Sequence, residues 1–112
     1  MLPRKYKLTL NNDFEKTFKT GRSMYGRFFG FKFRKNLLKY SRFGVILGLK
    51  IDKSSVNRHR LKRQIYSIVE NNCSRLSIPM DYVIIALPAI KEAKFVELET
   101  EITDFFTRIS KK

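Results

Sequence analysis

The sequence predicts an α+β fold, and two kinds of spacing among its apolar residues support this class. Phe29, Phe31 and Phe33 recur at every second position, which is the period of a strand with one buried face. Other stretches place their apolar residues three or four positions apart, as amphipathic helices do. At 112 residues, with no internal repeat or low-complexity linker, we expect one domain spanning residues 1–112 with short basic tails.

A short helix is expected at residues 12–20. Asn12 can cap its start together with Glu15, and Phe14 and Phe18 lie one turn apart on the same face. Gly21 suits the left-handed conformation that commonly follows a last helical turn. The segment therefore predicts a helix with an aromatic stripe.

Two strands are expected next, at residues 24–34 and, after a turn, at residues 43–49. In the first strand, phenylalanines occupy one face and the cations Lys32 and Arg34 occupy the other. The second alternates apolar residues with glycines such as Gly44, and we expect it to pair antiparallel with the first. Because the glycines leave one face bare, a chain of nucleotides could approach this backbone closely.

A long helix is expected from Ser54 or Ser55 to about Asn72. The residues that form its core-facing stripe are Leu61, Ile65, Ile68 and Val69. The opposite side carries His59, Arg60, Arg63 and Tyr66. The N-terminal half of this helix is therefore densely cationic.

The C-terminal part predicts a buried strand and an acidic helix. Residues 82–87 are continuously apolar, as expected for a strand covered on both faces, and this strand should run parallel to the one at 43–49 because a helix separates them. Residues 91–109 show helical spacing with acids between the apolar positions, the pattern of a solvated face. We expect this helix to cover the sheet on the side away from a polyanion.

The positive charge is confined to one half of the chain. The formal net charge is +14, from 24 Lys and Arg against 10 Asp and Glu. Residues 16–69 hold 15 of the basic residues and one acid, Asp52, whereas the remainder has nine of each sign. Because a solubilising surface mixes the two signs, this segregation indicates a surface that binds a polyanion.

Other features narrow the class of protein. Cys73 is the single cysteine, which suits a small buried side chain in a reducing cytosol and excludes an internal disulfide. The longest uncharged stretch is far shorter than the roughly 18 apolar residues of a spanning helix, and the first residues lack the apolar run of a signal peptide. We therefore expect a cytoplasmic protein with no membrane partner.

Catalysis by the protein's own side chains is not expected. His59 is the one histidine, and no carboxylate lies near it in the sequence to orient it as a base. The sequence has no glycine-rich phosphate loop, no hydrolase motif and no cluster with metal-ligand spacing. We expect neither a catalytic residue nor a metal site on the protein.

The start of the long helix is the clearest binding motif. Four cations fall within six residues, at Arg58, Arg60, Lys62 and Arg63. A helix start adds partial positive charge and free N–H groups, so these side chains together favour phosphate binding. The plain alternative is a solvated basic helix face.

This motif and its surroundings resemble the protein subunit of bacterial ribonuclease P. The segment from Arg58 to Arg63 resembles the family's Arg-Asn-Arg-type helix start, and Arg42-Phe43-Gly44, followed by Lys50 and Lys53, resembles the strand before it. Phe14 and Phe18 fit the Asp-Phe-x-x-x-Phe pattern of the family's first helix. The segment from Asp81 to Ala86 resembles its Asp-φ-Val-φ-φ-Ala strand, where φ is apolar. The likeness covers nearly the whole chain, and the departures from it are Lys32, Leu49, His59 and the pair Tyr66-Ser67.

The resemblance implies a two-layer sandwich in the order αβββαβα, with a left-handed βαβ crossover where general rules favour a right-handed one. It also implies that the catalyst is ribonuclease P RNA, which acts with Mg²⁺ held mainly by RNA. That RNA hydrolyses precursor tRNA to make the mature 5′ end. We expect a monomeric protein, one per RNA, with ribonuclease P RNA and precursor tRNA as its partners.

Two adjoining RNA surfaces are expected. The helix start would dock the RNA subunit through Lys53, Arg58, His59, Arg60, Lys62 and Arg63. By resemblance, a groove between the first helix and the sheet would hold the single-stranded 5′ leader through Phe14, Phe18, Lys32 and Arg34. Unpaired bases stack on aromatic rings with little sequence preference, which suits a variable leader. Burial in the core is the plain alternative for each of the two rings.

Two other classes of function stay open at this point. A ribosomal RNA-binding module or an RNA chaperone would share the charge and the aromatic residues, but it does not account for a match along the whole chain. A stand-alone nuclease would need carboxylates or histidines in the basic half, where Asp52 and His59 are the candidates.

Overall fold

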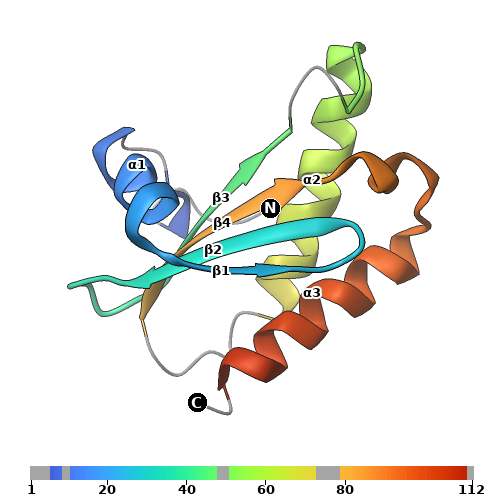
Figure 1. Cartoon of the computed structure of the whole chain (residues 1–112). Coiled ribbons are helices and arrows are strands. Elements are labelled where there is room, and N and C mark those ends of the chain that lie inside the picture. Colours follow the sequence, from blue (N-terminus) through green and yellow to red (C-terminus); the bar gives the residue numbers. More distant parts are fainter. Residues whose placement is uncertain (1–5, 9–10, 48–50, 73–78, 111–112) are drawn as a thin grey trace.

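Helices are interspersed among the strands along the chain (Figure 1). The computed structural model describes residues 6–8, 11–47, 51–72 and 79–110, so Leu49, Lys50 and Cys73 lie outside the described residues. Within these ranges the elements are α1 (Asn11–Thr20), β1 (Arg22–Tyr25), β2 (Phe29–Lys35), β3 (Arg42–Ile46), α2 (Ser55–Asn72), β4 (Met80–Ala86), the 3₁₀ helix η3 (Pro88–Glu92) and α3 (Phe95–Ser110). This order confirms the expected α+β class and the αβββαβα sequence of elements.

The strands of the described residues form one mixed sheet in the order β1-β2-β4-β3. Strand β2 pairs antiparallel with both β1 and β4, whereas β3 pairs parallel with β4. The expected parallel pairing of the third and last strands is therefore confirmed. The expected direct pairing of β3 with β2 is wrong, because β4 lies between them. Strand β4 is apolar on both of its faces, with Tyr82, Val83 and Ile84 all buried, so a central position suits it.

The single strand expected at residues 24–34 is also wrong, because the chain folds back into a β1–β2 hairpin there. The turn is held by a carboxylate from the far end of the sequence. Glu101 of α3 accepts hydrogen bonds from the backbone N–H groups of Arg27 at 2.6 Å, Phe28 at 3.1 Å and Phe29 at 2.7 Å. The sequence pattern predicts a solvated acidic face for this helix. Glu101 departs from that prediction, because its carboxylate binds the backbone of the β1–β2 turn.

The two faces of the sheet meet different helices (Figure 1). Phe29, Phe31 and Phe33 of β2 are buried in the core on the α2 and α3 side. On the opposite face, Lys32 Nζ donates to the Phe18 carbonyl of α1 at 3.1 Å, and Arg34 Nη1 donates to Thr20 Oγ1 at 3.4 Å. The predicted alternation of aromatic and cationic residues along this strand is confirmed.

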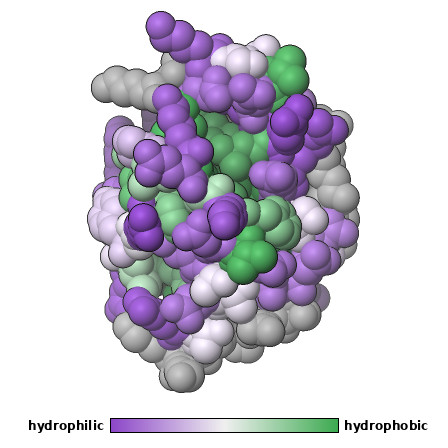
Figure 2. All heavy atoms as spheres, turned by 90° about the vertical axis from the view of Figure 1, so that its right-hand side faces the viewer, coloured by the Kyte–Doolittle hydropathy of each residue, from purple (hydrophilic) through white to green (hydrophobic). Residues whose placement is uncertain are grey.

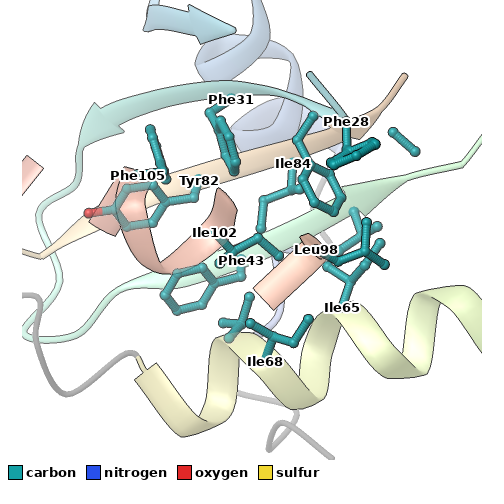
Figure 3. Packing of buried hydrophobic residues seen from close by; sticks show 14 of the residues in the cluster. Phe28, Phe31, Phe43, Ile65, Ile68, Tyr82, Ile84, Leu98, Ile102 and Phe105 are labelled. Atoms are coloured by element: carbon teal, nitrogen blue, oxygen red, sulfur yellow. The ribbon is translucent and has the colours of Figure 1, made fainter. Parts of the chain in front are cut away.

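Aromatic rings occupy the centre of the core (Figure 3). The rings of Phe31 and Phe105 stack with their centroids 3.8 Å apart, and those of Phe43 and Tyr82 stack at 5.1 Å. Helix α2 contributes the predicted stripe, of which Ile65, Ile68 and Val69 are fully buried and Leu61 packs at the edge. Burial of each such side chain contributes about 1.5–3 kcal/mol.

Helix α1 ends at Thr20 as expected, but the conformation of the next residue and the start of the last helix differ from expectation. Gly21 does not adopt a left-handed conformation; a Cβ there would lie 2.5 Å from the Thr17 carbonyl oxygen and 2.8 Å from that of Phe33. Glycine is therefore required by close packing of the α1 end against β2. The last helix begins at Phe95 rather than residue 91, because η3 precedes it and Glu97 Oε1 accepts the Lys94 N–H at 2.9 Å, as in a capping box.

The side of the molecule to the right of Figure 1 is mostly hydrophilic, with apolar atoms visible in a hollow (Figure 2).

In the described part of the chain, no helix has the length and apolar character needed to cross a membrane.

Glu101→Gln is expected to lower the free energy of unfolding by about 1–3 kcal/mol, because a neutral amide replaces the charged acceptor of three backbone N–H groups. Urea denaturation followed by circular dichroism measures this change. Glu99→Gln on the same helix removes the same charge from a half-exposed position and should change stability by less than about 0.5 kcal/mol. Equal losses in the two variants would contradict the role assigned to Glu101.

Tyr82→Phe is expected to leave stability at pH 7 unchanged or to raise it by up to about 1 kcal/mol, because the buried Tyr82 hydroxyl has no hydrogen-bond partner among the described residues. Burial raises the pKa of Tyr82 above the ordinary value of about 10, so the folded protein resists an ionisation that the unfolded chain undergoes. The wild type therefore loses stability above about pH 10, and the advantage of the variant should grow there.

Urea denaturation at pH 7 and at a pH above 10 tests this expectation. Tyr66→Phe is the matched control, since Tyr66 is also buried but has a hydrogen bond with the Val45 backbone and should lose stability at pH 7. A Tyr82→Phe protein less stable than Tyr66→Phe at pH 7 would refute the expectation.

Candidate nucleic-acid interface

The start of α2 is built around Asp52, the one acid of the cationic half. Its Oδ1 accepts the Ser54 N–H at 2.8 Å, and its Oδ2 accepts the Asn57 side-chain amide at 3.2 Å. Ser54 Oγ in turn accepts the Asn57 N–H at 3.3 Å, which settles Ser54 as the N-cap. The Ser54 N–H bond, assisted by the Asn57 bond, lowers the pKa of Asp52. This carboxylate is therefore committed to holding the helix start.

The six cationic and imidazole residues predicted to dock RNA differ in exposure. Arg58 is half-buried, and its Nη1 donates to the Asp52 carbonyl at 3.2 Å. The others are exposed, namely Lys53, His59, Arg60, Lys62 and Arg63. Arg58 thus ties the helix start to the preceding loop, and the remaining five present charge or hydrogen-bonding groups to solvent.

Part of this cationic surface borders a pocket that also contains an aromatic ring of α1. We call it the α2 pocket; its lining residues are Lys7, Leu8, Phe14, Val45, His59, Lys62, Arg63 and Tyr66. The structure therefore brings Phe14, predicted for the leader groove, beside residues predicted for the RNA-subunit surface. The two predicted surfaces are continuous here.

Lys7 was not predicted to belong to this site. Residue 7 forms a parallel bridge with Phe43, and the Leu8 N–H donates to the Phe43 carbonyl at 2.8 Å. This pairing brings Lys7 Nζ within 5.1 Å of the Tyr66 ring centroid. The charge of Lys7 is a weak signal in the sequence, and its pairing with β3 gives its position.

Tyr66 was expected on the outer side of α2 and is instead buried, at 4% exposure. The reason is that α2 is enclosed on a second side, where β3 and the N-terminal segment meet it at the α2 pocket. Burial raises the pKa of the Tyr66 hydroxyl, and a hydrogen bond with the Val45 backbone opposes this rise.

The bare patch expected over the glycines of residues 43–49 is filled at Gly44 by a ring of the protein, Gly30 of β2 is covered likewise, and Gly48 lies outside the described residues. A Cβ on Gly44 would lie 2.5 Å from Cε2 of Phe14, and a Cβ on Gly30 would lie 2.9 Å from Cε1 of Tyr25. The glycines therefore admit Phe14 and Tyr25 rather than leaving open backbone.

Of the other predicted leader residues, Phe18 lies further along α1, and Lys32 and Arg34 lie on β2. Phe18 is 41% exposed, and Lys32 Nζ lies 4.5 Å from its ring centroid. Arg34 borders a second pocket, which we call the β2 pocket; its lining residues are Lys16, Arg34, Lys35, Asn36, Leu37, Leu38, Arg42 and Asp81. The predicted groove is thus divided, with Phe14 at the α2 pocket and Arg34 at the β2 pocket.

Across the described ranges, no group of three or more His, Cys, Asp or Glu side chains lies close enough together to hold a metal ion.

Comparison with known proteins gives the family. The model of the family described as Ribonuclease P matches residues 2–110. A ribonuclease P protein component from Thermotoga maritima is 36% identical over 104 residues, which cover 93% of this chain and 83% of that protein. One from Fusobacterium nucleatum subsp. nucleatum is 28% identical over 103 residues, covering 88% and 92%.

Solved structures agree with this assignment. The ribonuclease P protein of T. maritima superposes with a TM-score of 0.82 at 28% identity, covering 91% of this chain and 96% of that one. A Staphylococcus aureus ribonuclease P protein has the same fold, with a TM-score of 0.83 at 23% identity and 95% coverage of each chain. Because sequence and fold agree over almost the whole length, the chain belongs to the bacterial ribonuclease P protein family.

Proposed function

We propose that this chain is the protein subunit of ribonuclease P, and that it binds both the RNA subunit and the 5′ leader of precursor tRNA. The observation that carries this proposal is the α2 pocket, where the Phe14 ring of α1 lies with the exposed cations Lys62 and Arg63 of α2. Cations beside an aromatic ring suit single-stranded RNA, since phosphates bind the cations and bases stack on rings.

The exposed side of the α2 start is the proposed docking surface for the RNA subunit. Arg60 and Lys53 are exposed and lie outside the α2 pocket, so they are available to a second RNA. Arginine binds phosphate through two parallel hydrogen bonds, and the nearby helix N-terminus adds partial positive charge. Structured RNA presents its phosphates at the surface, which matches this arrangement.

Phe18, one turn beyond Phe14 on α1, and Lys32 of β2 are the further proposed contacts for the leader. The Lys32 ammonium lies over the Phe18 ring, so that ring is held in place and remains 41% exposed. A base stacks on such a ring whatever its identity, and the ammonium attracts the adjoining phosphate. This chemistry suits leaders that differ between tRNAs.

Catalysis is assigned to the RNA subunit. We place the Mg²⁺ ions on RNA, because the described protein residues do not supply a ligand cluster for them. The protein's contribution is to screen the repulsion between two polyanions, which raises substrate affinity and helps to keep divalent ions near the cleavage site. We further propose one copy of the protein per RNA and a cytoplasmic location.

A cleavage assay tests the proposed function. Precursor tRNA is incubated at modest Mg²⁺ concentration with the protein alone, with ribonuclease P RNA alone, and with both. Cleavage at the mature 5′ end should occur only, or mainly, with both. Cleavage by the protein alone would overturn the proposal in favour of a nuclease, and no stimulation of the RNA would overturn it in favour of another RNA-binding role.

Phe18→Ala is expected to weaken binding of precursor tRNA to the holoenzyme by at least about fivefold, because one base stacked on a ring is worth about 1–3 kcal/mol. Binding of mature tRNA, which has no leader, should change little. Equilibrium binding of the two tRNAs, labelled with a fluorophore, measures both affinities.

Phe95→Ala is the matched control, since Phe95 on α3 is 42% exposed, against 41% for Phe18. This variant should bind both tRNAs as the wild type does. Equal weakening of precursor and mature tRNA by Phe18→Ala would argue against base stacking on this ring.

A further inference from the structure

We propose that the β2 pocket is a second binding site for an RNA backbone, distinct from the α2 pocket. This inference rests on the proposed function and extends it to residues for which no role was predicted, chiefly Lys16 and Lys35. The ligand class is a stretch of RNA phosphodiester, contributed either by the distal part of the leader or by the RNA subunit.

Cations from two separate elements converge on this pocket. Lys16 comes from α1, whereas Arg34 and Lys35 come from the end of β2. Lys16 and Lys35 are exposed, and Arg34 is half-buried. Convergence from distant parts of the sequence makes a concave positive site, which attracts phosphate more strongly than cations spread over a flat surface.

The acid that lines the pocket is neutralised from within the protein. Asp81 is 4% exposed, and Arg42 donates to both of its oxygens, from Nε at 2.9 Å and from Nη2 at 2.7 Å. Asn36 Nδ2 donates to Asp81 Oδ1 at 2.9 Å and also to the Tyr40 carbonyl at 3.2 Å. The Arg42–Asp81 pair therefore adds no net charge to the pocket. The positive charge of the pocket comes from Lys16, Arg34 and Lys35.

Arg34 is held in position before any ligand binds. Its Nη1 donates to Thr20 Oγ1 at 3.4 Å, and Thr20 Oγ1 donates to the Lys16 carbonyl at 2.6 Å. An arginine that is already ordered loses less side-chain entropy when it binds a phosphate.

Two leucines favour a nucleotide chain over a small inorganic anion. Leu37 is fully exposed and Leu38 is 37% exposed, and both line the same pocket as the cations. Apolar side chains next to phosphate-binding cations can contact riboses and base edges. The combination matches a polymer that alternates charged phosphates with apolar surfaces.

The pocket is continuous with the proposed leader contacts. Lys32 and Arg34 lie two positions apart on the same face of β2, and Lys32 lies over the exposed Phe18 ring. An RNA strand that stacks on Phe18 can therefore continue along β2 into this pocket.

The test compares two triple variants that each remove three positive charges. The pocket variant is Lys16→Gln/Arg34→Gln/Lys35→Gln, and the control is Lys91→Gln/Lys94→Gln/Arg108→Gln, whose residues are exposed and lie in η3, the linker after it and α3. One arm measures binding to ribonuclease P RNA over a range of KCl concentrations. The other measures binding of the reconstituted holoenzyme to precursor tRNAs with leaders of increasing length.

The pocket variant should lower the log–log salt slope of binding by about 2–3 relative to the control, since each phosphate-contacting cation contributes about 1. A change in the first arm identifies the RNA subunit as the ligand. A change in the second arm that appears only with long leaders identifies the leader.

Behaviour equal to the control in both arms would overturn the site. Because Arg34 has an intramolecular hydrogen bond, the double variant Lys16→Gln/Lys35→Gln tests the same site through exposed side chains alone and should lower the slope by about 1–2. Wild-type protein that fails to stimulate cleavage would instead refute the proposed function, so the two failures are distinguishable.

Discussion

The close packing of helix α1 on the sheet is the contact on which the rest of the cationic face depends. Thr17 of α1 is fully buried, and Gly44, which has no side chain, leaves the space that the Phe14 ring fills. At Gly21, any side chain would collide with the carbonyl oxygens of Thr17 and Phe33. The helix is therefore fixed at both ends, and its position separates the α2 pocket from the β2 pocket. A small change in α1 packing would alter both pockets together.

Strand β2 couples the stability of the domain to this surface. Its phenylalanines form part of the core, where Phe31 stacks on Phe105 of α3 at 3.8 Å. Its other face carries Lys32 and Arg34, which hydrogen-bond to α1. Because the side chains of a strand alternate between faces, the core fixes the direction in which these two cations point. The buried aromatic cluster therefore sets the face from which these cations project, and their hydrogen bonds to α1 hold them there.

Patterns of apolar residues in the sequence predict the features that depend on the spacing of nearby residues. They fail where residues far apart in the sequence come into contact. The core stripe of α2 and the alternation of β2 follow from periodicity, and the buried β4 follows from its continuous apolar run. The β1–β2 turn does not, because its N–H groups bond to Glu101, more than 70 residues away. Burial of Tyr66 depends on the residue 7 bridge to β3, and the separation of Phe14 from Arg34 depends on how α1 crosses the sheet. Each of these contacts is set by tertiary packing.

Asp52 at the start of α2 and Asp81 in the β2 pocket show how charge separation in the sequence becomes a positive face in the folded protein. Asp52 binds the start of α2, where hydrogen bonds from Ser54 and Asn57 lower its pKa. Asp81 is held by Arg42 and Asn36 at the floor of the β2 pocket. Both carboxylates are therefore occupied by internal partners, whereas Lys16, Lys35, Arg60 and Lys62 extend into solvent. An approaching RNA therefore meets these exposed cations before it meets either carboxylate.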